Sequence, residues 1–244
     1  MRTACLPICL ALLAACSGAQ VSSDDAAKAD FHYRLARNYY TDHNIAMTQR
    51  ELHEALRLDP GHAEAHHLKG FMLMGLADPD GAAAEFRAAL AAKPDLHEAR
   101  NNLGSVLISQ GRFEEAIQVL KPLTEDALYS TPAFAHGNIG WAYLQLGDVS
   151  SARRYLEMAV FLNPRFCLGY NNLGILHKDT GNRGAARESF EKAVKNCPKY
   201  AESWYYLGVL HQEANEPGPA QAAFEKCAEF AAETRLGQRC KVRL

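Results

Sequence analysis

The sequence lacks the short signatures of common enzyme classes and the charge balance of a nucleic-acid-binding protein. It has no G-x-S-x-G, H-E-x-x-H or G-x-G-x-x-G pattern and no Walker phosphate-binding loop. Its 26 lysines and arginines are balanced by 28 aspartates and glutamates, so there is no positive excess to attract a polyanion. We therefore expect a non-enzyme that needs no cofactor and does not bind nucleic acid.

The sequence also lacks paired metal ligands and a long apolar run. No C-x-x-C pair is present, which argues against a zinc or thioredoxin-like centre. His62, His66 and His67 cluster together, but no third ligand is fixed near them, so surface histidines are favoured over a metal site. The apolar run Leu6–Ala15 is about half of the ~20 residues that cross a bilayer, so no permanent transmembrane helix is expected.

The N-terminal segment has the pattern of an export signal. The positively charged start and the run Leu6–Ala15 are typical of a secretory signal peptide over residues 1–15. The sequence Leu13-Ala14-Ala15-Cys16 resembles the bacterial lipobox, which implies that Cys16 carries lipid and that the following serine directs the protein to the outer membrane. The alternative is an ordinary signal with an incidental cysteine. Residues 16–28 are small and polar, and are predicted to form a tether whose last twelve residues span roughly 20 Å.

From about residue 29 the sequence repeats with a period of 34. Pro60 and Pro94 are 34 residues apart, and so are Pro164 and Pro198. A small residue precedes each of these prolines by 24 positions, namely Ala36, Gly70, Gly140 and Gly174. An alanine follows in the second half of most units, four residues before a large apolar side chain. Such a fixed period indicates a repeat architecture.

These spacings resemble the tetratricopeptide repeat, and the clearest match is Trp204-x-x-Leu207-Gly208 followed by Ala220-x-x-x-Phe224. The resemblance implies an all-α, right-handed superhelical solenoid of helix–turn–helix units, in which the small residues let paired helices approach closely. Its six repeats would be 29–62, 63–96, 97–130, 133–166, 167–200 and 201–234, with a C-terminal cap over 235–244. Thr131-Pro132 lies outside this register, so the junction 124–132 is predicted to be irregular or a hinge.

In this family the first helix of each repeat faces a concave groove, and in three consecutive repeats the register places an asparagine on it. These residues are Asn102, Asn138 and Asn172. An asparagine both donates and accepts, so the three could bind the backbone of an extended partner segment. The alternative is that they bond neighbouring helices of the array itself.

Apolar side chains occupy other groove positions, namely Phe71, Phe134, Trp141, Leu144, Leu168, Ile175 and Tyr205. Aromatic residues on an exposed concave strip predict a protein-interaction site. The alternative is that they belong to the core. Cations are few in the strip, where only Arg34, Arg37 and Lys178 qualify, so a groove for acidic C-terminal tails is not favoured.

Apart from the three cysteines of the N-terminal segment, the chain has four, all in its last third. An even number of cysteines in an exported protein favours disulfides. They can pair in three ways. The repeat register places Cys167 at the start of one helix and Cys197 at the end of its antiparallel partner, so we favour Cys167–Cys197 together with Cys227–Cys240. The alternative is four reduced, buried thiols.

The whole arrangement of lipobox, short tether and six repeats resembles the type IV pilus biogenesis lipoproteins that act as pilotins. The resemblance implies a lipid-anchored protein at the periplasmic face of the outer membrane. Its partner would be a secretin subunit or another pilus-assembly component, and it would promote secretin insertion and multimer assembly. The alternative function is a periplasmic adaptor that scaffolds peptidoglycan enzymes or outer-membrane protein assembly.

Overall fold

A computed structural model describes residues 21–244, which form thirteen α-helices joined by short turns, with no strand in this range. The helices fall into two compact units, one ending at His62 and the other spanning Ala63–Leu244. Cys16 and the predicted signal segment lie outside the described residues. No helix in the described part of the chain is long and apolar enough to cross a membrane.

The first unit consists of α1 (Ser23–Thr41) packed against α2 (Ile45–Leu58). Helix α1 begins six residues before the predicted repeat, so the expectation of a tether through residue 28 is wrong at its C-terminal end. The Ser22 hydroxyl accepts a hydrogen bond from the backbone N–H of Asp25 and caps the helix. Asp24 and Asp25 lie in the first turn, where their negative charges interact favourably with the positive end of the helix dipole. The Lys28 ammonium forms an ion pair with Asp24, one turn away, at 2.5 Å.

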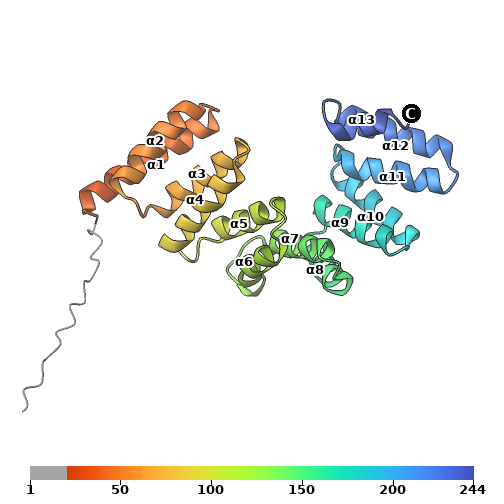
Figure 1. The fold of residues 1–244 in the computed structure, drawn as a ribbon, viewed down its shortest axis with the longest axis horizontal. Helices are drawn as coiled ribbons and strands as arrows, with labels where there is room; N and C mark the ends of the chain where they lie inside the picture. The colour runs from red at the N-terminus through yellow and green to blue at the C-terminus, as the bar shows by residue number, and fades with distance from the viewer. Residues whose placement is uncertain (1–20) are drawn as a thin grey trace, which may run out of the picture. The chain divides into compact units, whose positions relative to one another are not determined.

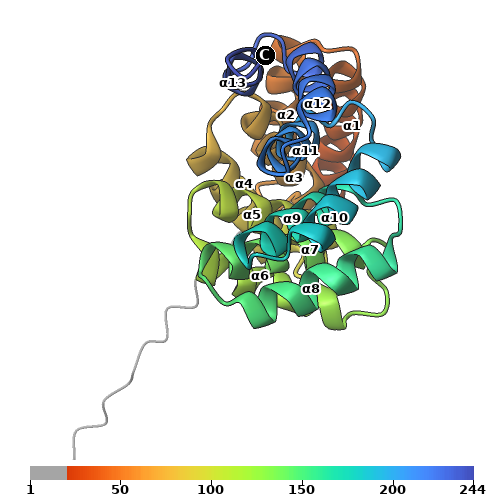
Figure 2. The same ribbon diagram turned by 90° about the vertical axis from the view of Figure 1, so that its right-hand side faces the viewer.

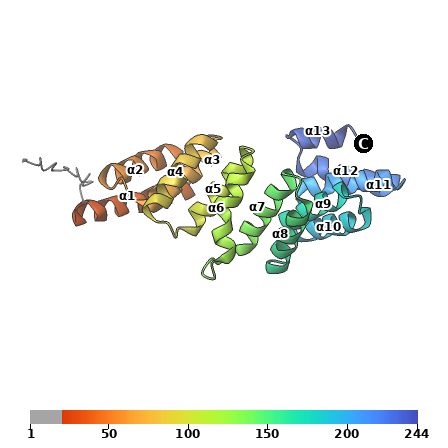
Figure 3. The ribbon, with the colours of Figure 1, turned by 60° about the horizontal axis from the view of Figure 1, so that its bottom comes forward.

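The second unit contains five further antiparallel helix pairs and a short terminal helix, which follow one another along the chain (Figures 1 and 3). The pairs are α3 (Ala63–Gly75) with α4 (Pro79–Ala92), α5 (His97–Ser109) with α6 (Phe113–Glu125), α7 (Pro132–Gln145) with α8 (Val149–Leu162), α9 (Cys167–Asp179) with α10 (Arg183–Asn196), and α11 (Ala201–Glu213) with α12 (Pro217–Phe230). The terminal helix α13 (Arg235–Lys241) packs on α12 (Figure 2).

Side-chain caps and prolines determine where these helices begin and end. Asp78, Asp148 and Asn182 each accept a backbone N–H in the first turn of α4, α8 and α10. Helix α8 ends at Leu162, and its C-cap Asn163 is extended because the following Pro164 disfavours a helical conformation of the residue before it.

The turn between the two helices of each repeat uses one residue with a left-handed backbone. Gly111, Gly147 and Gly181 have φ between 74° and 78°, as glycine readily allows. The same turn position is occupied by His43, Ala77 and Asn215 in the outer repeats, with φ between 55° and 58°. The recurrence of this turn keeps the two helices of every pair antiparallel.

The core runs through the unit between the paired helices. A Cβ added to Gly174 would lie 2.5 Å from the Phe190 ring, and one added to Gly208 would lie 2.6 Å from the Phe224 ring. Both phenylalanines are almost fully buried. The expected close approach of paired helices at small residues is therefore confirmed.

The segment 126–131 between α6 and α7 is longer than the corresponding segments 93–96 and 163–166. Its Tyr129 side chain is buried against Leu120, Leu123 and Ile139, and its ring lies 5.5 Å from the His97 ring. The junction is thus irregular, as predicted, and a buried aromatic side chain packs it against the neighbouring helices.

Candidate protein-binding surface

Three of the predicted groove residues present apolar surface to solvent. The exposed fractions are 43% for Phe71 on α3, 42% for Phe134 on α7 and 37% for Leu168 on α9. The Phe134 ring packs against the Phe166 ring in an edge-to-face arrangement, with the ring centroids 5.0 Å apart. All three side chains are partly exposed, and Phe134 is also held by its ring contact, which is the state expected of an anchor for a partner protein.

Phe134 also borders a hollow of about 390 Å³ at the end of the α7–α8 pair. Its walls come from the N-terminus of α7 and the C-terminus of α8, and include Pro132, Leu162 and Asn163. Leu162 is 42% exposed here. The hollow can accept an apolar side chain, while Asn163 offers a polar group at its rim.

The other apolar groove residues are packed within the array. Trp141 and Leu144 are half-buried against a core cluster that contains Ile175, and both Ile175 and Tyr205 are buried. The expectation that Ile175 and Tyr205 line an open groove is therefore wrong for this structure. Ile175 packs in a cluster with side chains of α10 and α11, and Tyr205 packs in a cluster with side chains of α12 and α13.

The asparagines bond neighbouring helices, which is the alternative role open to them from the sequence. The Asn102 side-chain amide on α5 donates to Nε2 of His67 on α3 at 3.0 Å. Asn138 on α7 donates to Oδ1 of Asn101 on α5 at 3.4 Å. These bonds use donor hydrogens that a partner backbone would need, so a ladder of free asparagines is not present.

Asn172 is buried, 5% exposed, and offers almost no surface to a ligand. Its neighbour Asn171 is 1% exposed and carries the link that sequence reasoning missed. Asn171 accepts a hydrogen bond from the Ser203 hydroxyl at 2.8 Å and donates to Glu202 at 3.3 Å. These two hydrogen bonds therefore link α9 to α11. The repeat pattern does not distinguish Asn171 from Asn172 as the residue that forms them.

Burial controls the protonation of the histidine in the first of these links. Burial lowers the pKa of His67, although Glu98 and Glu64 act in the opposite direction. A neutral ring with an unprotonated Nε2 is what the Asn102 amide requires as an acceptor. The same effect therefore keeps the α3–α5 bond intact at neutral pH.

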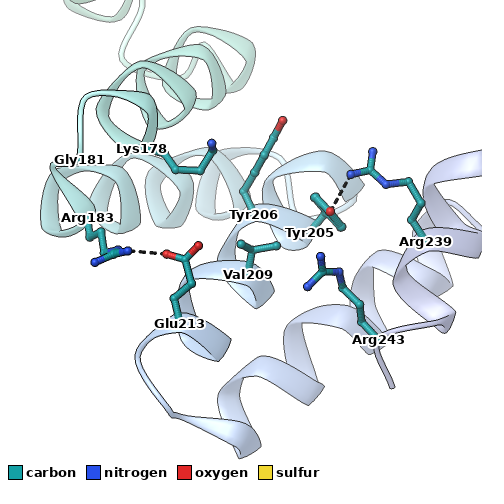
Figure 4. Close-up of a pocket in the computed structure, with 9 residues that line it drawn as sticks. All are labelled: Lys178, Gly181, Arg183, Tyr205, Tyr206, Val209, Glu213, Arg239 and Arg243. Carbon is teal, nitrogen blue, oxygen red and sulfur yellow. Dashed lines mark hydrogen bonds and ion pairs between the residues drawn. The ribbon is translucent and has the colours of Figure 1, made fainter.

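A second hollow, of about 480 Å³, lies at the C-terminal end of the array (Figure 4). Tyr205, Tyr206 and Val209 of α11 form its floor, and Glu213 lies at the end of the same helix. Lys178 and Arg183 approach from the α9–α10 pair, while Arg239 and Arg243 approach from the C-terminal segment (Figure 4). The sequence predicts only a C-terminal cap for that segment.

Hydrogen bonds and ring contacts hold these cations in position. Arg239 donates to the Tyr205 hydroxyl at 2.6 Å, and its guanidinium lies 4.5 Å from the Tyr205 ring centroid. The Arg243 guanidinium lies 5.6 Å from the same ring. Burial, with Glu202 and Asp179 nearby, raises the pKa of the Tyr206 phenol, which therefore stays neutral and can donate a hydrogen bond at neutral pH.

The two cysteine pairs that the repeat register favours lie at disulfide distance. The S–S distances are 2.12 Å for Cys167–Cys197 and 1.98 Å for Cys227–Cys240. Whether these bonds form in the expressed protein stays a prediction. Within residues 21–244, no group of three histidine, cysteine or carboxylate side chains is placed to hold a metal ion.

Comparison with known proteins agrees with the repeat architecture. Models of the tetratricopeptide repeat match residues 73–128, 135–166 and 169–200. The type IV pilus assembly protein PilF of Pseudomonas aeruginosa is 31% identical over 134 residues. That alignment covers 55% of this chain and 53% of PilF, so the chain matches about half the length of this curated relative.

Two solved structures share the fold. PilW, described as a widely conserved type IV pilus biogenesis factor, has a TM-score of 0.76 and 22% identity over 86% of this chain and 97% of its own. The structure of P. aeruginosa PilF has a TM-score of 0.74 and 23% identity over 91% of this chain and all of its own. The expected resemblance is thus confirmed: the chain is an all-α tetratricopeptide-repeat solenoid protein, related in sequence to a type IV pilus assembly protein.

Proposed function

We propose that this protein is a pilotin, a lipid-anchored scaffold of the outer membrane that promotes insertion and multimer assembly of a type IV pilus secretin. The observation that carries the proposal is the 31% identity to a type IV pilus assembly protein over 134 residues. The fold agrees with this role, because repeat solenoids bind other proteins through extended surfaces. Lipid on Cys16 would hold the repeats at the periplasmic face.

The partner would bind to the exposed apolar side chains of the first helices. Phe134 and Leu168 are both exposed and belong to adjacent repeats. An apolar segment of the secretin could place one side chain in the hollow beside Phe134 and another against Leu168. Burying such anchors removes apolar surface from water, which is the main source of affinity in a protein interface.

Deletion of the gene tests the function itself. We expect secretin monomers in place of heat-resistant multimers on a denaturing gel, together with loss of surface pili. Normal multimers in the deletion strain would refute the proposal. A deletion with normal multimers but defective peptidoglycan or outer-membrane proteins would favour the adaptor function instead.

A double variant tests the surface. Phe134→Ser with Leu168→Ser should weaken capture of the secretin at least tenfold, which corresponds to about 1.4 kcal/mol of binding free energy. The matched control is Phe161→Ser with Val149→Ser on α8, whose side chains are also exposed. Loss only in the control would move the binding surface to α8, and equal loss in both variants would contradict a specific role of Phe134 and Leu168.

The membrane anchor is tested separately. Cys16→Ala should release the protein from the outer-membrane fraction without changing its helical circular-dichroism spectrum. Retention of the variant in that fraction would show that another segment or partner holds the protein there.

A further inference from the structure

The C-terminal hollow contains two kinds of cation. Lys178 and Arg183 already have carboxylate partners, with Lys178 at 2.5 Å from Asp179 and Arg183 at 3.0 Å from Glu213. Their charges are largely neutralised within the protein.

Arg239 and Arg243 differ because their hydrogen-bond partners are neutral. Arg239 donates to the Tyr205 hydroxyl and Arg243 donates to the side-chain carbonyl of Gln212 at 2.7 Å. Among residues 21–244, neither guanidinium forms an ion pair with a carboxylate. Both are exposed and both line the hollow (Figure 4). The site therefore holds two positive charges without a negative counterpart.

We propose that this hollow binds an acidic segment of a partner protein through its aspartate or glutamate side chains. A guanidinium offers a planar pair of N–H donors that matches a carboxylate, and such charge-assisted bonds are the stronger kind. Tyr206 and Val209, the partly exposed residues of the floor, would contact the apolar stem of the acidic residue. The Tyr206 hydroxyl, which also lines the hollow, could supply a further donor.

The shape of the site favours a protein ligand over a membrane surface or a nucleic acid. The cations converge on one hollow of about 480 Å³ with an aromatic floor, and that volume suits one or two side chains. The chain as a whole has no excess of positive charge. This inference goes beyond the proposed function, and it holds whether or not the partner is a secretin.

Fluorescence anisotropy with two synthetic peptides tests the proposal on the soluble repeats expressed with the C-terminal segment intact. One fluorescein-labelled peptide alternates glutamate with leucine and serine, and the other carries glutamine in place of each glutamate. Both are blocked at their ends to exclude terminal charges. We expect measurable binding of the glutamate peptide, at least tenfold weaker binding of the glutamine peptide, and weaker glutamate binding as sodium chloride rises from about 0.05 M to about 0.5 M.

Variants locate the binding in the hollow. Arg243→Glu should reduce affinity for the glutamate peptide at least tenfold, while Arg243→Lys, which keeps the charge but not the planar donor pair, should reduce it less. Lys195→Glu, on the exposed surface of α10 outside the hollow, makes the same change in net charge and should leave affinity within about twofold. Circular dichroism and the melting temperature confirm that each variant is folded.

Three outcomes would overturn the proposal. Equal binding of both peptides would remove the role of the carboxylates. Wild-type affinity in Arg243→Glu would place any acidic-peptide binding elsewhere. Binding to phosphatidylglycerol vesicles that depends on Arg243, without binding of the glutamate peptide, would make the site a membrane contact.

Discussion

Single glycines set the distance between the two helices of a repeat. Gly104, Gly174 and Gly208 each face a large buried side chain that already occupies the space of a Cβ. The sequence predicts this from the period alone, because a small residue recurs at one position and a large one follows at a fixed distance. Packing of this kind is local, so a repeat register is enough to predict it.

Gly174→Ala tests this packing at one residue. The added Cβ would lie 2.5 Å from Phe190, so we expect a loss of about 1–3 kcal/mol in unfolding free energy, measured by urea denaturation. Gly184→Ala on α10 is the matched control, since no atom lies within 4 Å of its Cβ position. Because alanine is the better helix former, the control should gain up to about 1 kcal/mol. A stabilised Gly174→Ala would contradict the close approach.

The asparagines show where residue-level prediction fails. Asn171 and Asn172 are adjacent and identical, and both are buried, yet only Asn171 has an identified bond to the next repeat. Its role depends on Ser203 and Glu202, which lie more than thirty residues further along the chain. A repeat pattern predicts which face a residue occupies, but the bonding partner comes from the neighbouring repeat and varies between repeats.

At the scale of helices, starts and ends follow from caps, prolines and the left-handed turn. Most helix pairs begin where the period predicts, whereas α1 begins earlier because Ser22 caps it. The residues before position 29 are small and polar, which is typical of a tether. Ser22, Asp24 and Asp25 nevertheless form a favourable helix N-terminus. Composition alone does not distinguish these two cases.

The link between α3 and α5 should respond to pH. Burial lowers the pKa of His67 from its usual 6.5, so the unfolded chain binds a proton more readily than the folded chain. The stabilising contribution is complete above about pH 6.5 and is lost as pH falls through the lower folded pKa. We expect the melting temperature to fall less between about pH 7.5 and about pH 5 in His67→Gln than in the wild-type protein.

Exposed His53→Gln on α2 controls for the loss of an imidazole elsewhere and should keep the wild-type pH dependence. A His67→Gln variant with an unchanged pH dependence would show that the Asn102–His67 bond does not depend on a neutral ring. Differential scanning fluorimetry across a buffer series is sufficient for this comparison.

At the scale of the whole molecule, the C-terminal segment does more than cap the array, because two of its arginines line the hollow. Arg239 and Arg243 reach the floor of the hollow only because α13 packs back on α11 and α12. The sequence predicts few cations in the concave strip of the repeats, where only Arg34, Arg37 and Lys178 qualify. Residues outside the repeat pattern have no register, so their positions were not predictable from it.

Disulfides at the two cysteine pairs would link helices within the last two repeats and the C-terminal helix, and should raise stability there. Under non-reducing conditions we expect no alkylation of Cys167, Cys197, Cys227 or Cys240 in the exported protein, measured by intact mass. Cys167→Ser with Cys197→Ser opens a loop with a sequence separation of 30, which should cost roughly 3.5 kcal/mol in the chain-entropy model.

The loss should be local, since each repeat contacts only its neighbours. Hydrogen exchange should therefore show faster opening of α9 and α10, while α3 and α4 change little. Full alkylation of all four cysteines without reductant would contradict the two disulfides. Unchanged hydrogen exchange in the double variant would contradict a stabilising effect of Cys167–Cys197.

The bonds between successive repeats also have a kinetic consequence. Among residues 21–244, the identified side-chain bond of greatest sequence separation joins Asn138 to Asn101, only 37 positions apart in a chain of 244. Nearly all stabilising contacts therefore close short loops, which cost little chain entropy. Such a low contact order predicts rapid folding that can begin in any repeat and spread to its neighbours, before the rest of the chain is available.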